Sequence, residues 1–218
     1  MLRFLESLQF VLFIFFTAAY AYQIVYLVIG LFGKGRGGKQ DAKLHRYAAI
    51  IAARNEAGVI GDLIGTLKKQ DYPEELLDVF VIADNCTDNT AEVSRQAGAI
   101  VYERFNKVQV GKGYALDYLF HHIFDDYGEA TYDGFFVFDA DNLVDPQFVR
   151  EMNKMFDTGE YAALTSYRNS KNFCDNWISA GYALWFLREA RFLNRPRTQL
   201  GVNCAVSGTG FLVAADTI

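Results

Sequence analysis

Residues 135–146 read FFVFDADNLVDP, an apolar run that ends in two aspartates, Asp139 and Asp141. Four consecutive apolar residues before polar ones are typical of a strand buried on both faces of a sheet. Side chains two positions apart in an extended segment lie on the same face, so both carboxylates can reach one cation. Hard divalent cations such as Mg²⁺ or Mn²⁺ prefer oxygen ligands. The same acids can instead form an Asx turn that ends the strand, with Pro146 in the first turn of the next helix.

Strand-like and helix-like segments alternate on both sides of this run. Short apolar runs predict strands, and apolar positions at helical spacing predict the helices between them. Asn89, with Glu92 three positions later, resembles a capping-box helix start. The alternation predicts an α/β domain with a mainly parallel sheet. The expected strands are 48–53, 78–83, 99–102, 135–138 and 162–165, and the expected helices are 56–70, 89–97, 113–124 and one that begins near Pro146.

Polar residues follow three of these strands, at positions 54–56, 84–88 and 139–141. A single polar turn is an ordinary way to end a strand. Ligands of parallel sheets bind at the carboxyl ends of the strands, where all three groups are expected to lie. Three such groups at one edge therefore favour a binding site over three unrelated turns.

The N-terminal region differs sharply in composition, because residues 7–33 carry no charged side chain. As a helix this stretch would reach roughly 40 Å, at about 1.5 Å per residue. The hydrocarbon core of a bilayer is about 30 Å thick. A signal peptide has a shorter apolar region and a small-residue cleavage site, and a buried core helix is the other alternative. We predict that residues 1–33 form one transmembrane anchor.

The flanking charges predict the orientation of this anchor. Only Arg3 and Glu6 precede the uncharged run 7–33, and their charges cancel. The basic residues that follow it place the rest of the chain in the cytoplasm and the protein in the cell membrane. Residues 34–46 are glycine-rich and are expected to form a flexible linker near anionic lipid headgroups. The basic residues in and beside this segment are Lys34, Arg36, Lys39, Lys43 and Arg46, against the single acid Asp41.

Charge and cysteine content exclude several other classes of protein. The formal net charge is −5, which argues against a nucleic-acid partner, although the short basic segment 34–46 could in principle bind one. The three cysteines are widely spaced and form no CxxC pair. A disulfide scaffold and a cysteine-based zinc site are therefore not expected.

Five segments together resemble family 2 glycosyltransferases, the group that holds cellulose, hyaluronan and poly-N-acetylglucosamine synthases. They are IIAARNE (50–56), VIADNCTDNT (81–90), GKGYALD (111–117), FVFDADN (136–142) and SGTGFLV (207–213), in family order. The resemblance implies a GT-A domain over residues 47–218, a Rossmann-like nucleotide-diphospho-sugar transferase fold preceded by one transmembrane helix. It also implies metal-dependent transfer of a sugar from a UDP-sugar to a hydroxyl of a glycan or lipid acceptor, with inversion, as in polysaccharide biosynthesis.

The resemblance implies roles for individual residues. For the UDP-sugar, the nucleoside is assigned to Ala53, Arg54 and Glu56, and the uracil base to Asp84. The diphosphate is assigned to Lys112 and Asp139. Binding of Mg²⁺ or Mn²⁺ is assigned to the DxD pair, Asp139 and Asp141. The acceptor side of the site is assigned to Ser207, Gly208, Thr209 and Gly210. One departure lies in the second turn, where the family's DGSTD is DNCTD at positions 84–88. Lys112 matches the family segment, and a solvated loop lysine is the alternative interpretation.

No ED motif, which in this family supplies the catalytic base, and no QxxRW motif follow residues 207–210. We expect the general base to lie beyond Ile218 and the chain to be a truncated family member. Two other functions stay open: a non-catalytic membrane-tethered nucleotide-sugar-binding module, and a nucleotidyltransferase, whose usual glycine-rich first loop with a lysine is missing here. The aromatic and arginine-rich segment 176–195 can lie at the membrane interface or pack against the sheet.

Overall fold

The computed structural model describes residues 2–218, which form two compact units. We call Gly37–Ser166 with Val206–Ile218 the sheet unit, and the residues up to Arg36 with Tyr167–Ala205 the anchor unit.

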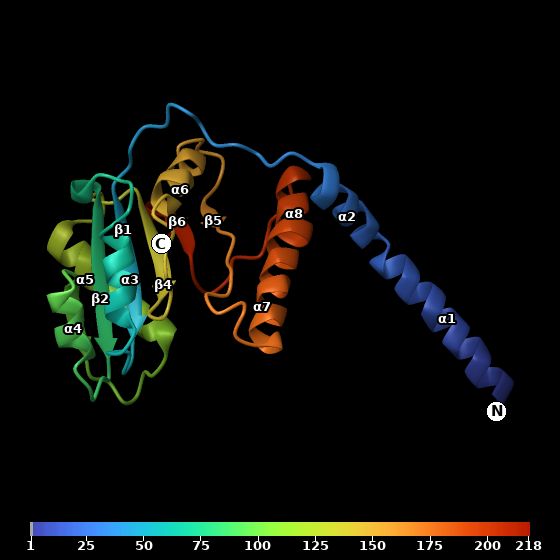
Figure 1. Ribbon diagram of the computed structural model, residues 1–218, viewed down its shortest axis with the longest axis horizontal. Helices are drawn as coiled ribbons and strands as arrows, with labels where there is room; N and C mark the ends of the chain where they lie inside the picture. The colour runs from blue at the N-terminus through green and yellow to red at the C-terminus, as the bar shows by residue number, and fades with distance from the viewer. Residues whose placement is uncertain (1) are drawn as a thin grey trace. The chain divides into compact units, whose positions relative to one another are not determined.

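The sheet unit is a six-stranded mixed sheet in the order β3-β2-β1-β4-β6-β5 (Figure 1). Neighbours β3, β2, β1 and β4 are parallel, and β6 is antiparallel to both β4 and β5. The mainly parallel α/β sheet predicted from the sequence is therefore confirmed. The strands are β1 (Tyr47–Ala53), β2 (Leu77–Asp84), β3 (Ile100–Arg104), β4 (Gly134–Asp139), β5 (Ala163–Thr165) and β6 (Phe211–Ala214).

Helices cover both faces of this sheet. They are α3 (Ile60–Leu67), α4 (Thr90–Gln96), α5 (Lys112–Tyr127) and α6 (Phe148–Phe156), with short 3-10 segments η1 (Glu74–Leu76) and η3 (Ala215–Thr217). Along β1, Ala49 and Ile51 pack into the core under α3 and α6, whereas Ala48 and Ile50 pack into the core under α5. A strand sandwiched in this way must be apolar throughout, which explains the unbroken run at its position in the sequence.

Two helix starts differ from the sequence expectation. The helix predicted over 56–70 begins only at Ile60, because the preceding residues form the turn after β1. The Asn89 side chain makes no capping hydrogen bond, so the capping-box prediction is wrong. Asp88 takes this part instead: its Oδ1 accepts hydrogen bonds from the Thr90 backbone N–H at 3.0 Å and from Thr90 Oγ1 at 2.5 Å.

The predicted linker 34–46 is bonded to the sheet unit over its second half. The Lys39 N–H donates to the carbonyl of Lys154 in α6 at 3.0 Å, and Asn153 Nδ2 donates to the carbonyl of Lys43 at 3.0 Å. His45 Nε2 lies 2.9 Å from Asp157 Oδ1, just after α6. These contacts fix the chain on α6 before it enters β1.

The anchor unit contains α1 (Leu2–Tyr20), α2 (Tyr22–Phe32), α7 (Trp177–Arg188), the π-helical segment η2 (Glu189–Asn194) and α8 (Arg195–Gln199). A turn at Ala21 separates α1 from α2. Over residues 2–218, Arg3–Phe32 is the one helical stretch long and apolar enough to cross a membrane. A signal sequence near an N-terminus meets the same criteria.

Candidate functional site

The parallel register brings the three polar strand ends to one edge of the sheet. Ala53 of β1 pairs with Ala83 of β2, and Ala52 pairs with Asp139 of β4. The turns after β1 and β2 and the end of β4 therefore lie at the same edge, as the sequence predicts. Parallel α/β sheets bind their ligands at this edge.

Hydrogen bonds join the turns after β1 and β2. Cys86 Sγ lies 3.5 Å from both the Ala53 carbonyl and the Asn55 backbone nitrogen, so this thiol bridges the two turns. Asn55 Oδ1 accepts from the Thr87 N–H at 2.8 Å. Thr90 Oγ1 accepts from the Glu56 N–H at 2.8 Å. The backbones of Ala53 and Glu56 are thus held against the β2 turn. The Arg54 side chain is exposed.

Asn55 and Asn85 are the two non-glycine residues with positive φ, at 58° and 53°, among the residues described. Asparagine adopts this left-handed conformation more readily than most residues. This explains how Asn85 can stand where the family turn has glycine. The Asn85 side chain also accepts from the Asn106 N–H at 2.9 Å and donates to the Asn106 carbonyl at 3.1 Å. The substitution therefore ties the β2 turn to the segment after β3.

Asp84, the residue expected at the nucleotide base, is buried in an ion pair with Arg104. Arg104 Nη1 lies 2.7 Å from Asp84 Oδ1, and both residues are only 5% exposed. A second guanidinium nitrogen of Arg104 donates to the Gln109 carbonyl at 2.8 Å. The guanidinium carbon lies 5.8 Å from the centre of the Tyr118 ring. Asp84 is consequently held in one position at the edge of the sheet.

A pocket of about 430 Å³ adjoins this ion pair. The segment after β3 and the first turns of α5 form its walls. This volume lies in the range of small-molecule sites, about 300–1,000 Å³. Its lining residues are Arg104, Phe105, Asn106, Gln109, Tyr114, Asp117, Tyr118 and His121.

Lys112 lies across from Asp139 and connects three parts of the site. Its Nζ donates to Asp139 Oδ1 at 2.5 Å and to the Gly208 carbonyl at 2.8 Å. Both side chains are partly exposed. The structure therefore brings the predicted diphosphate lysine, the first DxD aspartate and the predicted acceptor segment into direct contact.

The acceptor segment is anchored on β4 through its backbone and one hydroxyl. The Asp139 N–H donates to Thr209 Oγ1 at 2.8 Å, and Thr209 Oγ1 donates to Asn142 Oδ1. The Gly210 N–H donates to the Val137 carbonyl at 2.8 Å. Gly210 has φ 66°, which favours glycine. Ser207 lies half-buried in the same segment.

Asp139 and Asp141 offer a fitting but incomplete donor set for a divalent cation. Asp139 is the last residue of β4 and Asp141 lies two positions beyond it, where Asn142 Nδ2 donates to Asp141 Oδ1 at 3.2 Å. Within residues 2–218 no cluster of three or more histidine, cysteine or acidic side chains could hold a metal. Mg²⁺ usually takes one or two carboxylates and completes its shell with water and substrate phosphates, so two aspartates match that chemistry.

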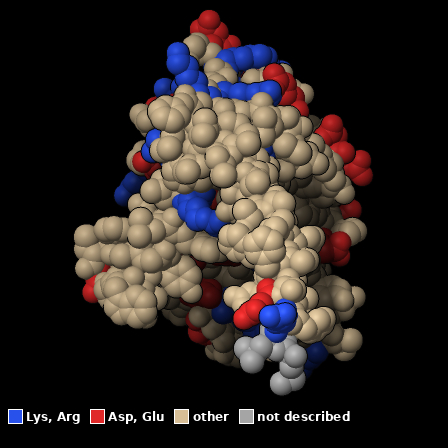
Figure 2. Space-filling model, turned by 90° about the vertical axis from the view of Figure 1, so that its right-hand side faces the viewer, with Lys and Arg blue, Asp and Glu red and all other residues tan. Residues whose placement is uncertain are grey.

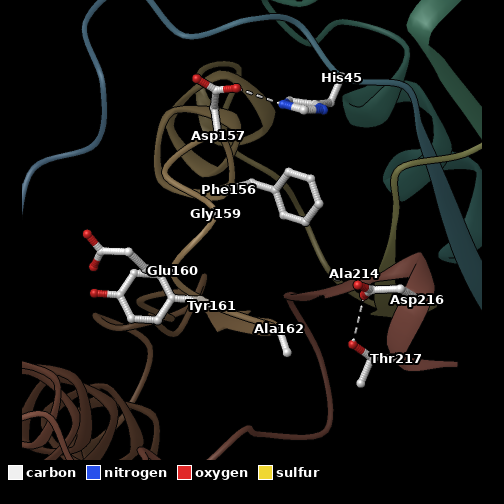
Figure 3. A pocket seen from close by; sticks show the side chains of 10 residues that line it. All are labelled: His45, Phe156, Asp157, Gly159, Glu160, Tyr161, Ala162, Ala214, Asp216 and Thr217. Atoms are coloured by element: carbon white, nitrogen blue, oxygen red, sulfur yellow. Dashed lines mark hydrogen bonds and ion pairs between the residues drawn. The ribbon is translucent and has the colours of Figure 1, made fainter.

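A second pocket, of about 450 Å³, lies away from these strand ends (Figure 3). Its walls include His45, which precedes β1, and Asp157, which follows α6, and these two side chains point toward one another. The His45 hydrogen bond, followed by the contact with Lys39, lowers the pKa of Asp157 to about 2. We assign this pocket a structural role, in holding residues 39–45 on α6.

Sequence reasoning missed Arg104 and the role of Thr90, and it placed Asn55 and Asn85 at the ligand edge without predicting their side-chain hydrogen bonds. The expected third strand ended at 102, so Arg104 was not assigned to the ligand edge. The observed strand ends at Arg104, and its pairing with Asp84 in the β2–β3 register places it there. The sequence signal that could have located Arg104 at this edge is its position just after the apolar run 99–102.

Residues 45–218 match the family described as "Glycosyltransferase like family 2". The chain belongs to this family. It is 26% identical over 178 residues to a beta-monoglucosyldiacylglycerol synthase from Synechocystis sp., a match that covers 78% of the chain and 35% of that protein. It is 33% identical over 91 residues to the low-salt glycan biosynthesis hexosyltransferase Agl6 from Haloferax volcanii, which covers 39% of the chain and 21% of that protein. The chain thus spans about a third or less of the length of these relatives.

Two solved structures share the fold. The mannosyltransferase PcManGT from Pyrobaculum calidifontis, in complex with GDP-Man and Mn²⁺, has a TM-score of 0.57 and 20% identity, covering 73% of this chain and 47% of that one. Glucosyl-3-phosphoglycerate synthase from M. tuberculosis has a TM-score of 0.50 and 21% identity, covering 79% and 58%. With the family match, they confirm the GT-A fold expected from the sequence.

Proposed function

We propose that this protein is a membrane-anchored glycosyltransferase that moves a sugar from a UDP-sugar to a hydroxyl group of a glycan or lipid acceptor. The observation that carries the proposal is the contact of Lys112 with both Asp139 and Gly208, at the edge that also holds Asp84. Lys112 thus contacts both Asp139, which is assigned to the diphosphate, and Gly208, which is assigned to the acceptor side.

The base of the donor is assigned to the Asp84 edge. The carboxylate is fixed by Arg104 at 2.7 Å, so it is pre-organised rather than mobile. A fixed acceptor of hydrogen bonds suits the imide N–H of uracil, and the backbones of Ala53 and Glu56 are held on the turn that follows Asp84. Arg54, on the same turn, is exposed and is assigned to the nucleoside.

The diphosphate is assigned to Lys112, Asp139 and Asp141. When bound, Mg²⁺ or Mn²⁺ on the two aspartates supplies positive charge beside the diphosphate. Lys112 can leave Asp139 for a phosphate oxygen, because the pair is partly exposed and the lysine side chain is flexible. Its ammonium then stabilises the negative charge that develops on the leaving diphosphate.

The bond changes of the proposed transfer balance as one displacement. The acceptor oxygen bonds to the anomeric carbon, the bond from that carbon to the diphosphate oxygen breaks, and its electron pair stays on the diphosphate. The acceptor proton passes to a carboxylate base, which is not assigned among these residues. One displacement inverts the anomeric configuration. Residues 207–210 are assigned to the acceptor side.

The anchor is assigned to Arg3–Phe32, and the basic residues after it favour a cytoplasmic catalytic domain. The two relatives support the acceptor class, because their names describe a glucosyldiacylglycerol synthase and a glycan hexosyltransferase. A family member that binds a nucleotide-sugar without transferring it is the second candidate. It is favoured only if binding occurs without any product.

Calorimetric titration of the full chain in detergent tests the donor site. UDP should bind more tightly than GDP or ADP, and Mn²⁺ should raise its affinity. Asp141→Asn should remove most of this gain, whereas Asp88→Asn, a nearby carboxylate assigned to the helix start, should keep it. Equal UDP affinity in EDTA, or no preference for uracil, would contradict the assignment. Incubation with UDP-sugars and glycan or lipid acceptors, followed by product analysis, then separates transfer from binding alone.

A further inference from the structure

Helix α7 turns apolar side chains toward solvent. Trp177, Tyr182 and Trp185 are 82%, 61% and 59% exposed, whereas the small residues Ser179 and Ala183 on the other side are buried. A helix that faces water normally carries its polar residues outside, the reverse of this arrangement. Contiguous exposed apolar surface of this kind usually marks an interaction site.

The exposed face of α7 is wide. With 100° per residue, the exposed apolar positions span about 220°, more than half of the helix circumference; they are Trp177, Ile178, Tyr182, Leu184, Trp185 and Leu187. Figure 2 shows a face of the molecule on which uncharged side chains predominate, with one basic patch near its middle. A face this wide suits a fluid apolar environment better than a narrow helix–helix seam.

The segment after α7 is docked on the C-terminal end of α2. A Cβ added to Gly30 of α2 would lie 2.4 Å from Cδ1 of Phe192, so only glycine permits this approach. Arg191 Nε donates to the Gly30 carbonyl at 3.1 Å, and Arg195 donates to the Gly33 carbonyl. The aromatic segment is thereby attached where the apolar helix ends and the basic residues begin.

The chemistry of α7 matches a lipid headgroup region. Tryptophan and tyrosine concentrate at the membrane–water interface, where one end of each ring is apolar and the other is wet. Arg188, at the α2-proximal end, lies 5.7 Å from the Trp185 ring centre. The neighbouring acid Glu189 is paired with Arg168 at 3.0 Å, so it does not neutralise Arg188.

We propose that α7 lies in the interfacial layer of the bilayer that α1 and α2 cross. Trp177, Tyr182 and Trp185 insert at the boundary between headgroups and acyl chains, and Arg188 binds anionic headgroups. This inference rests on the membrane anchoring proposed above. It adds a second, surface-lying contact with lipid that follows from the docking of η2 and α8 on α2.

The chain offers an intrinsic reporter, because Trp177 and Trp185 are its only two tryptophans. The full chain would be reconstituted into vesicles of phosphatidylcholine and phosphatidylglycerol that contain brominated lipids. Bromine near the headgroup should quench the fluorescence more than bromine at the end of the acyl chains. The emission should be blue-shifted relative to the urea-unfolded chain, and acrylamide should quench it less. Trp177→Phe and Trp185→Phe should each leave this behaviour in the remaining tryptophan.

Two results would overturn the inference. Emission quenched by acrylamide as in the unfolded chain, with no effect of brominated lipid, would place α7 in water. Blue-shifted emission without quenching by brominated lipid would mean that protein, either a second copy or another chain, covers the helix. Arg188→Gln should reduce the additional quenching obtained when phosphatidylglycerol is included, and no change there would remove the headgroup contact.

A separate variant tests the anchor itself. Phe15 lies in α1, and Phe15→Trp in the Trp177→Phe, Trp185→Phe background places one tryptophan there. Quenching of this residue by deep bromine, without shallow quenching of the α7 tryptophans, would refute the interfacial helix while retaining the anchor. Absence of both would refute membrane anchoring as well.

Discussion

Replacing Arg104 by methionine should destabilise the sheet unit strongly. The Arg104 and Asp84 side chains are 5% and 7% exposed and are joined at 2.7 Å. Methionine fills much of the same volume but leaves the Asp84 carboxylate buried without its charged partner. Removing one member of such a pair costs about 3–5 kcal/mol. For a domain of this size about 2–4 °C are lost per kcal/mol, so the unfolding temperature should fall by about 6–20 °C.

The assay is thermal unfolding of the detergent-solubilised full chain, followed by circular dichroism. Arg150→Met is the matched control, because Arg150 pairs with Asp71 at the same kind of distance, 2.9 Å, but both side chains are 50% exposed. An exposed pair contributes at most about 1 kcal/mol, so this variant should unfold within a few degrees of the parent.

The double variant Asp84→Asn, Arg104→Met completes the test. It removes the stranded charge, so its unfolding temperature should lie above that of Arg104→Met alone. The reasoning is refuted if Arg104→Met unfolds like Arg150→Met, or if the double variant shows only the sum of the two single losses. Either result would mean that Asp84 is not held by Arg104 in a dry environment.

Three further predictions concern the rest of the sheet unit. Lys112→Met should weaken UDP binding roughly 10- to 150-fold in calorimetry, because it removes a charge-assisted contact of about 1.5–3 kcal/mol. The unfolding temperature should hardly change, because the pair of Lys112 with Asp139 is partly exposed. Asp157→Asn should make stability less sensitive to acid. The lowered pKa of Asp157 contributes stability above about pH 4, which is lost as the pH falls toward about 2, so thermal unfolding should show a larger loss of unfolding temperature across that window for the parent than for the variant. Asn85→Ala should be less stable than Asn85→Gly by about 1 kcal/mol in urea unfolding, because alanine is strained at φ 53° and glycine is not; equal stability of the two would contradict it.

The sequence predicted the parts of the fold that depend on strong local patterns. Apolar runs bounded by polar residues located β1, β2 and β4 to within one residue, because a strand buried on both faces tolerates no polar side chain. The shared edge of Asp84 and Asp139 followed from the parallel order of these strands. The contact between Lys112 and Gly208 did not, because no local pattern relates residues so far apart in the chain.

The misses have physical causes. β3 is short and partly exposed, so its apolar pattern fades before its end, and Arg104 was left outside the strand. At α4, Asn89 and Asp88 are both good helix-capping residues, and sequence alone did not decide which side chain would reach Thr90. The apolar run near the N-terminus correctly predicted helix, but the turn at Ala21 carries no glycine or proline signal.

The DNCTD turn shows how a departure from the family pattern can preserve a site. Glycine at position 85 would meet the demand for positive φ without any side-chain contact. Asparagine meets the same demand and adds two hydrogen bonds to Asn106, beyond the end of β3. Arg104, at the end of that strand, closes on Asp84 at the start of the turn. The Asn85–Asn106 hydrogen bonds and the Asp84–Arg104 ion pair both join the end of β2 to the end of β3. The β2 turn and the segment after β3 must therefore stay in place or move together. A nucleobase seated at Asp84 would therefore meet an edge whose geometry is set before it arrives, which lowers the entropic cost of binding.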